Sequence, residues 1–363
     1  PRSTPLPQPL VWFVMKRRRF LARAAATIAA HGSAQTATAK MSVGVIGHTG
    51  RGNYGHGLDT VWLKLVEAEI AAVADANANG LARELKRLKV SRGFSDYREM
   101  LSQVRPKIVA VCPRHADQHH DMTMAAIGAG VRGVYIEKPF CRTPAEADAI
   151  LAACNENNVK LAVAHRNRYH PVLQTIDKMI EDGAIGRLLE IRGRGKGDRR
   201  GGAEDLWVLG SHVLNLIHYF GGDPKSCSAV LLQGGRPVVK ADVKDGAEGL
   251  GPLAGDQLHA RYEMPRGRIA YFDSIANDGT NGAGFGLQLI GSKGIIAIQC
   301  DRRPLAHLSP GNPFQPTDQP RRWVPISTAG AGAAEPRDGL DERISSHVSA
   351  AQDLIDAIIH DRE

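Results

Sequence analysis

A glutamate, a lysine and a proline follow directly on a short apolar run in this chain. Residues 133–136 read Gly-Val-Tyr-Ile, and Glu137, Lys138 and Pro139 come next. A run of this kind after a glycine is typical of a strand inside a parallel sheet, and ligands bind at the carboxyl ends of such strands. Lys138 is therefore a candidate catalytic amine, and a solvated surface cation is the alternative.

A glycine-rich turn follows an earlier apolar strand, residues 41–46. Apolar residues at helical spacing between residues 58 and 66 predict that a helix begins after this turn. Glycines let the backbone approach a diphosphate closely, and the first N–H groups of a helix would hold its charge. Because a threonine stands where the dinucleotide fingerprint has its middle glycine, an ordinary glycine-rich loop is the alternative. The candidate cofactor contacts in the turn are Gly47, Thr49, Gly50, Arg51 and Gly52.

A second strand, residues 70–74, ends at Asp75. An acid in this place accepts hydrogen bonds from an adenosine ribose and repels a 2′-phosphate, so it favours NAD over NADP. An N-cap or turn aspartate is the alternative. Further apolar strands at residues 107–111, 133–136 and 160–164 alternate with helical stretches. This alternation predicts an α/β fold with a doubly wound parallel sheet over residues 41–165.

The second half, residues 166–363, has a different pattern. Alternating apolar segments separated by glycine turns predict a largely antiparallel open sheet in an α+β domain. A helical stretch over residues 206–220 carries His212 and ends at a pair of glycines. Asn215 lies three residues after His212 and therefore on the same helix face. The predicted strands are residues 188–196, 257–264, 268–275, 287–291 and 295–299.

These motifs together resemble the Gfo/Idh/MocA oxidoreductases, named for glucose–fructose oxidoreductase, inositol dehydrogenase and a rhizopine catabolism protein. The resemblance runs from about Val43 to the end of the chain. Its most specific parts are residues 137–140, residues 168–171 (Arg-Tyr-His-Pro) and residues 210–215 (Gly-Ser-His-Val-Leu-Asn). It implies an NAD-binding Rossmann domain, and Lys138 and His212 as the catalytic pair.

The resemblance also implies a substrate and further contacts. The substrate would be a sugar, glycoside, cyclitol or polyol, and the open sheet would join subunits in a homo-oligomer. Additional cofactor contacts would be Cys112, Pro113, His120, Glu137 and Lys138. Substrate contacts would be Arg168, Tyr169, Asp205, His212 and Asn215.

The chain departs from the family beside His212. Family members usually carry an aspartate four residues before this histidine and another acid three residues after it, and here those places hold Val208 and Asn215. Either Asp205 reaches in from one turn away, or Asn215 orients the substrate as a neutral group, or the chemistry has changed. Two further functions therefore stay open: a redox-neutral glycosidase or lyase that retains its NAD, and a non-catalytic dinucleotide or sugar sensor.

Neither a metal site nor a disulfide framework is predicted. His115, His119 and His120 crowd one stretch, but no cysteine or glutamate joins them at the spacing of metal ligands. The five cysteines are scattered along the chain and odd in number, so at least one thiol stays free in a monomer.

The net charge of +8 comes mostly from the first 39 residues. They hold six of the 46 Lys and Arg and no Asp or Glu, which leaves 40 basic against 38 acidic residues in the remainder. Aromatic residues make up only 5% of the chain, and no basic stripe interleaves with them. Nucleic acid is therefore not predicted as a partner.

The two ends of the sequence carry their own expectations. Residues 15–21 read Met-Lys-Arg-Arg-Arg-Phe-Leu, and with Ala37-Thr38-Ala39 they resemble a twin-arginine export signal, which predicts a periplasmic enzyme. The alternative is a cytoplasmic protein whose first residue is Met41. No segment approaches membrane-spanning length, so no membrane partner is predicted. A helical apolar stripe over residues 344–358 runs to Glu363 without a cap, which predicts a truncated reading frame.

Overall fold

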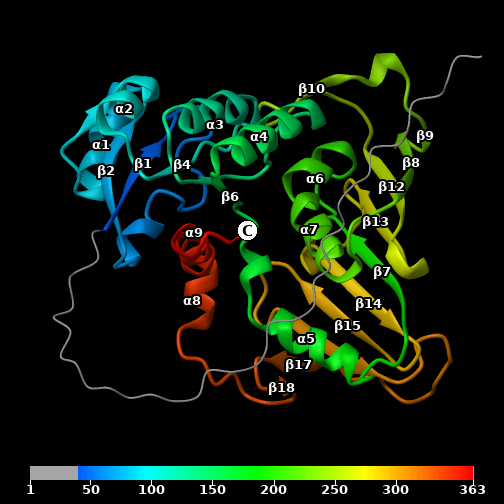
Figure 1. Cartoon of the computed structure of the whole chain (residues 1–363). Helices are drawn as coiled ribbons and strands as arrows, with labels where there is room; N and C mark the ends of the chain where they lie inside the picture. Colours follow the sequence, from blue (N-terminus) through cyan, green and yellow to red (C-terminus); the bar gives the residue numbers. More distant parts are fainter. Residues whose placement is uncertain (1–39, 363) are drawn as a thin grey trace, which may run out of the picture. The chain divides into compact units, whose positions relative to one another are not determined.

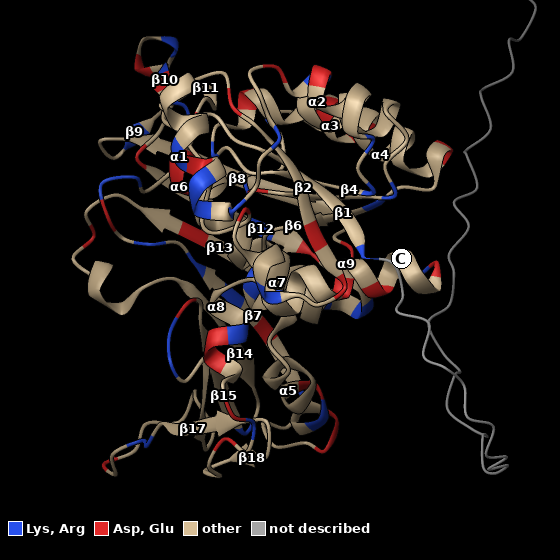
Figure 2. Ribbon diagram, turned by 90° about the vertical axis from the view of Figure 1, so that its left-hand side faces the viewer, with Lys and Arg blue, Asp and Glu red and all other residues tan. Residues whose placement is uncertain are grey.

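The computed structural model describes residues 40–362, and the predicted export signal lies outside the described residues. No helix in this part of the chain combines the length and apolar composition needed to cross a bilayer. Two sheets organise the described residues (Figure 1). Figure 2 shows Lys and Arg interspersed with Asp and Glu along both.

The first sheet has six parallel strands in the order β3, β2, β1, β4, β5, β6. The chain order switches between β1 and β4, and loops that leave adjacent strands there open a crevice for a ligand. This confirms the predicted doubly wound sheet. The strands are β1 (Met41–Ile46), β2 (Ala68–Ala74), β3 (Gly93–Phe94), β4 (Ile108–Val111), β5 (Gly133–Ile136) and β6 (Lys160–Val163).

Helices connect these strands, and local sequence signals start three of them. Asn77, Asp96 and Thr143 each cap a helix by accepting a hydrogen bond from a backbone N–H in the first turn. The side chains of the second, third and fourth helices pack on one face of the sheet. The helices are α1 (Ala78–Leu88), α2 (Tyr97–Val104), α3 (His119–Gly128) and α4 (Pro144–Asn157).

The helix predicted after the glycine turn does not form. Residues 48–60 contain turns and no helix, and only a four-residue 3₁₀ helix, η1 (Val61–Lys64), follows. Gly50, Gly52 and Gly55 have φ angles of 88°, 84° and 65°, which a right-handed helix cannot contain. The apolar side chains that suggested a helix, Leu58 and Val61 among them, are nevertheless buried against the sheet.

The second sheet has ten strands in the order β18, β17, β16, β15, β14, β7, β13, β12, β8, β9. Its pairs are antiparallel except for the parallel pair β7 and β13, so the predicted mainly antiparallel sheet is confirmed. The strands are β7 (Leu188–Arg194), β8 (Ser226–Gln233), β9 (Arg236–Pro237), β12 (Gln257–Glu263), β13 (Ile269–Ile275), β14 (Gly286–Gly291), β15 (Gly294–Gln299), β16 (Ala306–Pro310), β17 (Val324–Ser327) and β18 (Gly330–Ala331).

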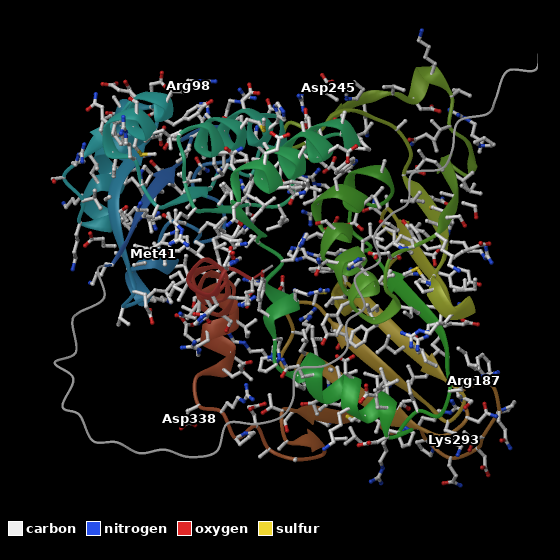
Figure 3. The ribbon with its side chains drawn as sticks, viewed as in Figure 1. Met41, Arg98, Arg187, Asp245, Lys293 and Asp338 are labelled. Carbon is white, nitrogen blue, oxygen red and sulfur yellow. The ribbon has the colours of Figure 1, made fainter. Side chains whose placement is uncertain are left out.

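One face of this sheet is covered by α5 (Val172–Glu181) and α7 (Gly210–Gly221). The single helix predicted over residues 206–220 is in fact two, because Leu209 separates α6 (Ala203–Val208) from α7. A separate hairpin of β10 (Lys244–Gly246) and β11 (Gly251–Leu253) leaves the sheet between β9 and β12. Figure 3 labels Asp245 on β10.

The last two helices, α8 (Leu340–Ser345) and α9 (Val348–His360), return to the first half. Leu354, Ile355 and Ile358 of α9 pack on the parallel sheet together with residues 54–65. The predicted division at residue 165 stays a prediction, but by packing α9 belongs with the first sheet and not with residues 166–338. The predicted apolar stripe is buried, as expected of a helix that covers a sheet.

Candidate active site

The glycine turn lines a cavity of about 530 Å³ at the carboxyl ends of β1, β2 and β4. Gly47, Arg51 and Asp75 are on its wall, as are Asp117 and Gln118 of the loop after β4. A Cβ atom at Gly50 would have no neighbour within 4 Å, whereas one at Gly47 would collide with the Tyr54 ring at 2.2 Å and one at Gly52 with the Arg114 backbone N at 2.3 Å. The turn therefore rests on protein on one side and is open on the other.

Asp75 faces inward and organises the turn. Its carboxylate accepts hydrogen bonds from Thr49 N and from Thr49 Oγ1 (2.6 Å), Tyr54 OH (2.9 Å) and Asn77 N (2.9 Å). Only 1% of Asp75 is exposed. Thr49, which stands at the middle-glycine position of the dinucleotide fingerprint, is thus held in the turn by hydrogen bonds to Asp75. A contact of Asp75 with a ribose stays a prediction.

His119, and not the predicted His120, joins the two strand ends beside the candidate lysine. Its Nε2 lies 2.7 Å from the Pro113 carbonyl oxygen and its Nδ1 2.7 Å from that of Pro139, and the ring is fully buried. His120 is partly exposed and pairs with Asp121. The helical period holds the missed signal, because His119 shares the buried face of α3 with Met122 and Thr123.

Cys112 and Glu137 follow β4 and β5. Burial raises the pKa of the Cys112 thiol well above its usual value, so this residue contributes a neutral side chain. Burial also raises the pKa of Glu137, but the hydrogen bond with His56 (2.9 Å) and the charges of His56, Lys138 and His347 together outweigh it, and the carboxyl pKa is lowered overall. Glu137 Oε2 is buried without a partner. His56, which comes from the irregular segment after the glycine turn, was not predicted.

Lys138 is 5% exposed and reaches across to the second half of the chain. Its Nζ donates a hydrogen bond to the Val208 carbonyl oxygen at 3.1 Å. Val208 ends α6, and because of the break at Leu209 this carbonyl oxygen has no helical N–H to donate to it: His212 N donates to the Leu209 oxygen instead. The place where the family carries an acid therefore contributes a main-chain acceptor.

His212 lies close to Lys138 and stacks edge to face with His165, at 5.1 Å between ring centroids. Burial, the His165 ring and the Lys138 amine lower the pKa of His212 well below its usual value. Burial and Lys138 lower the pKa of His165 to about 4. Both imidazoles are therefore neutral near pH 7. His212 Nδ1 and His165 Nε2 are buried and have no partner among the described residues.

Asn215 and Asp205, two further predicted substrate contacts, differ in their hydrogen bonding. The Oδ1 atom of Asn215 is buried without a partner. Asp205 does not approach Lys138 through any hydrogen bond of the described residues: its Oδ2 accepts from Ser274 Oγ (2.7 Å) and from Lys196 N (3.1 Å). Burial raises the pKa of Asp205 to about 6, despite the bond from Ser274. It therefore braces the ends of β7 and β13.

Arg168 and Tyr169 follow β6. The Arg168 guanidinium lies 4.7 Å above the Tyr219 ring, and its Nη1 is 3.4 Å from the Asn215 carbonyl oxygen. Tyr169 packs with the core of the first sheet, where burial raises its pKa to about 12. Arg168 also contributes to lowering the pKa of His165. Substrate contacts of Arg168 and Tyr169 stay predictions.

Comparison with known proteins agrees with this geometry. Residues 41–165 match the family described as oxidoreductases with an NAD-binding Rossmann fold, GFO_IDH_MocA. These residues carry the NAD-binding domain of the Gfo/Idh/MocA oxidoreductases. This confirms the resemblance seen in the sequence.

Several relatives of this chain are named as dehydrogenases of small polyhydroxy compounds. Levoglucosan dehydrogenase of Pseudarthrobacter phenanthrenivorans is 25% identical over 64% of this chain and 65% of its own length. D-apiose dehydrogenase of Paraburkholderia graminis is 32% identical over 42% of this chain and 40% of its own. The alignments thus span less than two thirds of both relatives. A structure of levoglucosan dehydrogenase with NADH and levoglucosan shares the fold, with a TM-score of 0.67, 22% identity, and coverage of 89% of this chain and 91% of that one.

The cavity at the glycine turn fits NAD. Its position at the switch between β1 and β4 is where dinucleotides lie in doubly wound sheets, and the open side of Gly50 allows a diphosphate to approach the backbone. Among the described residues, no group of three or more His, Cys, Asp or Glu is placed to bind a metal ion.

Proposed function

We propose that this chain is an NAD-dependent oxidoreductase that removes a hydride from a carbinol carbon of a sugar, glycoside, cyclitol or polyol. One observation carries the proposal: the Lys138 amine, which follows the parallel sheet, is held 3.1 Å from the Val208 carbonyl oxygen, at the break before the helix that carries the neutral His212 imidazole. Two relatives named for levoglucosan and D-apiose support the substrate class.

The roles follow from charge. Bound NAD supplies the acceptor of the hydride. His212 is neutral and has an unpartnered buried nitrogen, so it accepts the proton of the substrate hydroxyl. Lys138 donates a hydrogen bond to the same oxygen, with the Val208 carbonyl holding the amine in place. Asn215 offers a neutral acceptor for a second hydroxyl.

The cofactor would be held by the turn and the strand ends. Gly50 and Arg51 would face the diphosphate, while the loops after β4 and β5, with Pro113 and Glu137, would border the nicotinamide. His119 fixes these two loops to one another through its two carbonyl contacts.

A substrate panel with the purified protein tests the proposal. We expect NADH formation with at least one of levoglucosan, D-apiose and scyllo-inositol, or with a close analogue of them, in the presence of added NAD. Tight NADH binding without any reaction across the panel would favour a sensor. Release of an aglycone from glycosides without net NADH formation would favour the redox-neutral reaction.

We also propose that the enzyme forms a homo-oligomer through the uncovered face of its second sheet and is exported. A cavity of about 630 Å³ hollows that face, and the exposed Trp323 lies on its wall. Trp323→Arg should lower the mass measured by light scattering if the face joins subunits.

Replacing Arg17 and Arg18 with Lys tests the proposed export. The double variant should stay in the cytoplasm, and an unchanged location would contradict export.

A further inference from the structure

The backbone N–H groups of residues 47–51, in the glycine turn, are all paired within the protein. Every N–H from residue 47 to residue 51 donates a hydrogen bond to another group of the chain. The acceptors are Ala74 O, Asn53 O, Asp75, Asn53 Oδ1 and His48 O, in that order. No helix begins at the turn either, because only the four-residue η1 follows, from Val61. The usual partners of a dinucleotide diphosphate, free amides and a helix N-terminus, are therefore missing from these residues.

The side chain of Arg51 supplies a positive charge at this turn. Arg51 belongs to the turn after β1, and its guanidinium pairs with Asp117 of the loop after β4. The pair thus spans the switch point of the sheet, on the wall of the 530 Å³ cavity. Arg51 is 49% exposed and Asp117 21%, so a ligand in the cavity can reach both.

The other charges on the wall are already engaged. Arg98, which Figure 3 labels, lies on α2 beyond β2 and covers the Tyr97 ring at 4.5 Å. Asp96 caps α2, Asp121 pairs with His120, and Asp75 is turned into the protein. Of the two arginines on the wall, Arg51 is the one that belongs to the turn at the switch point, whereas Arg98 follows β2.

We infer that Arg51 neutralises the cofactor diphosphate in place of a helix N-terminus, and that it leaves Asp117 to do so. A guanidinium binds phosphate oxygens in bidentate fashion, and this charge-assisted contact exceeds what a neutral amide supplies. The inference rests on the proposed NAD binding. The affinity for the cofactor then depends on Arg51, which exchanges the Asp117 carboxylate for the diphosphate.

Fluorescence titration with NADH, with ADP and adenosine as competitors, tests the inference. Arg51→Gln should weaken NADH and ADP by about ten- to a hundredfold and leave adenosine, which has no phosphate, within about twofold. Arg51→Lys should restore part of the affinity, because it keeps the charge but not the bidentate geometry. The matched control is Arg114→Gln, which removes a neighbouring arginine that does not line the cavity, and it should change none of the three affinities.

Asp117→Asn gives a result of opposite sign. Because Arg51 no longer has to leave a carboxylate, NADH should bind several-fold more tightly. Equal NADH affinity in wild type and Arg51→Gln would overturn this inference alone, as would a loss of adenosine equal to the loss of ADP. A wild-type protein that binds no NADH would overturn the proposed function as well.

Discussion

The glycine turn and the substrate end of the candidate site differ in how far their polar atoms are satisfied by the protein. At the glycine turn, the Asp75 carboxylate accepts from Thr49, Tyr54 and Asn77, and the N–H groups of residues 47–51 have acceptors within the chain. At the substrate end, buried nitrogen and oxygen atoms of His212, His165 and Asn215 have no partner among the described residues.

This difference indicates two kinds of construction. A saturated turn is rigid before the cofactor binds, so most of its residues contribute to stability. Buried polar atoms without partners cost stability unless a ligand pairs with them. Those of the substrate end are therefore best explained as partners of substrate hydroxyls. Changes at the substrate end should lower turnover and leave stability intact, and changes at the turn should do the reverse.

Lys138→Met should produce the largest effect. The variant keeps the length of the side chain and removes the amine, so turnover should fall about 10³-fold or more while the Kd for NADH stays within about threefold. Steady-state rates and NADH titration measure the two quantities. Turnover within about tenfold of wild type would remove Lys138 from the chemistry.

His212→Asn should lower turnover by about 10²-fold, because the proton acceptor is lost. The free energy of unfolding should not fall by more than about 1 kcal/mol, since the imidazole has a buried nitrogen without a partner. Rate measurements and urea unfolding give both numbers. A variant that unfolds easily yet retains its turnover would show a structural histidine instead.

Asp75→Asn, at the glycine turn, should lower the free energy of unfolding. An amide NH₂ would face the Thr49 or Tyr54 donors, which costs about 1–3 kcal/mol of unfolding free energy. Turnover at saturating NAD and substrate should change little by comparison. Urea unfolding of this variant beside Asp96→Asn, which alters only a helix cap, checks the size. A large loss of turnover with full stability would reverse the contrast between the two ends.

The stability of the fold should also depend on pH. Burial lowers the pKa of His165 and of His347 to about 4, so the unfolded chain binds more protons than the folded one below about pH 6.5. Stability should therefore be complete above that pH and fall towards pH 4. The raised pKa of Asp205, about 6, opposes part of this fall. Each buried imidazole costs about 2 kcal/mol near pH 5.

The variant His165→Asn should accordingly show a shallower loss of unfolding free energy between about pH 7 and pH 5. His218→Asn, which changes an exposed histidine, is the matched control and should follow the wild-type curve. If both variants follow it, the buried imidazole is not the source of the acid sensitivity.

The sequence predicted those parts of the fold that apolar runs determine. Strands of the parallel sheet and of the second sheet were recognised because their side chains are buried in regular patterns, and Lys138 was located by its place at a strand end. The same patterns misled where the backbone decides. The apolar residues after the glycine turn are buried as helical residues would be, but positive φ angles at three glycines prevent a helix from starting in the turn, and only the four-residue η1 follows.

The details of the site depended on contacts between distant segments. The burial of His119 follows from the buried face of α3 and could have been predicted from the helical period, while a cofactor contact of His120 stays a prediction. The Val208 carbonyl as the partner of Lys138 could not, because it requires the break at Leu209 and the meeting of two sheets. His56 likewise reaches Glu137 only because the segment after the turn is not helical.

Transfer of deuterium tests the central claim most directly. A substrate from the panel is labelled at the reacting carbinol carbon, mixed with NAD and enzyme, and the reduced cofactor is analysed by mass spectrometry. The wild type should place the label on the nicotinamide, and Lys138→Met, with NADH binding intact, should place almost none there. Undiminished labelling by that variant would contradict the account.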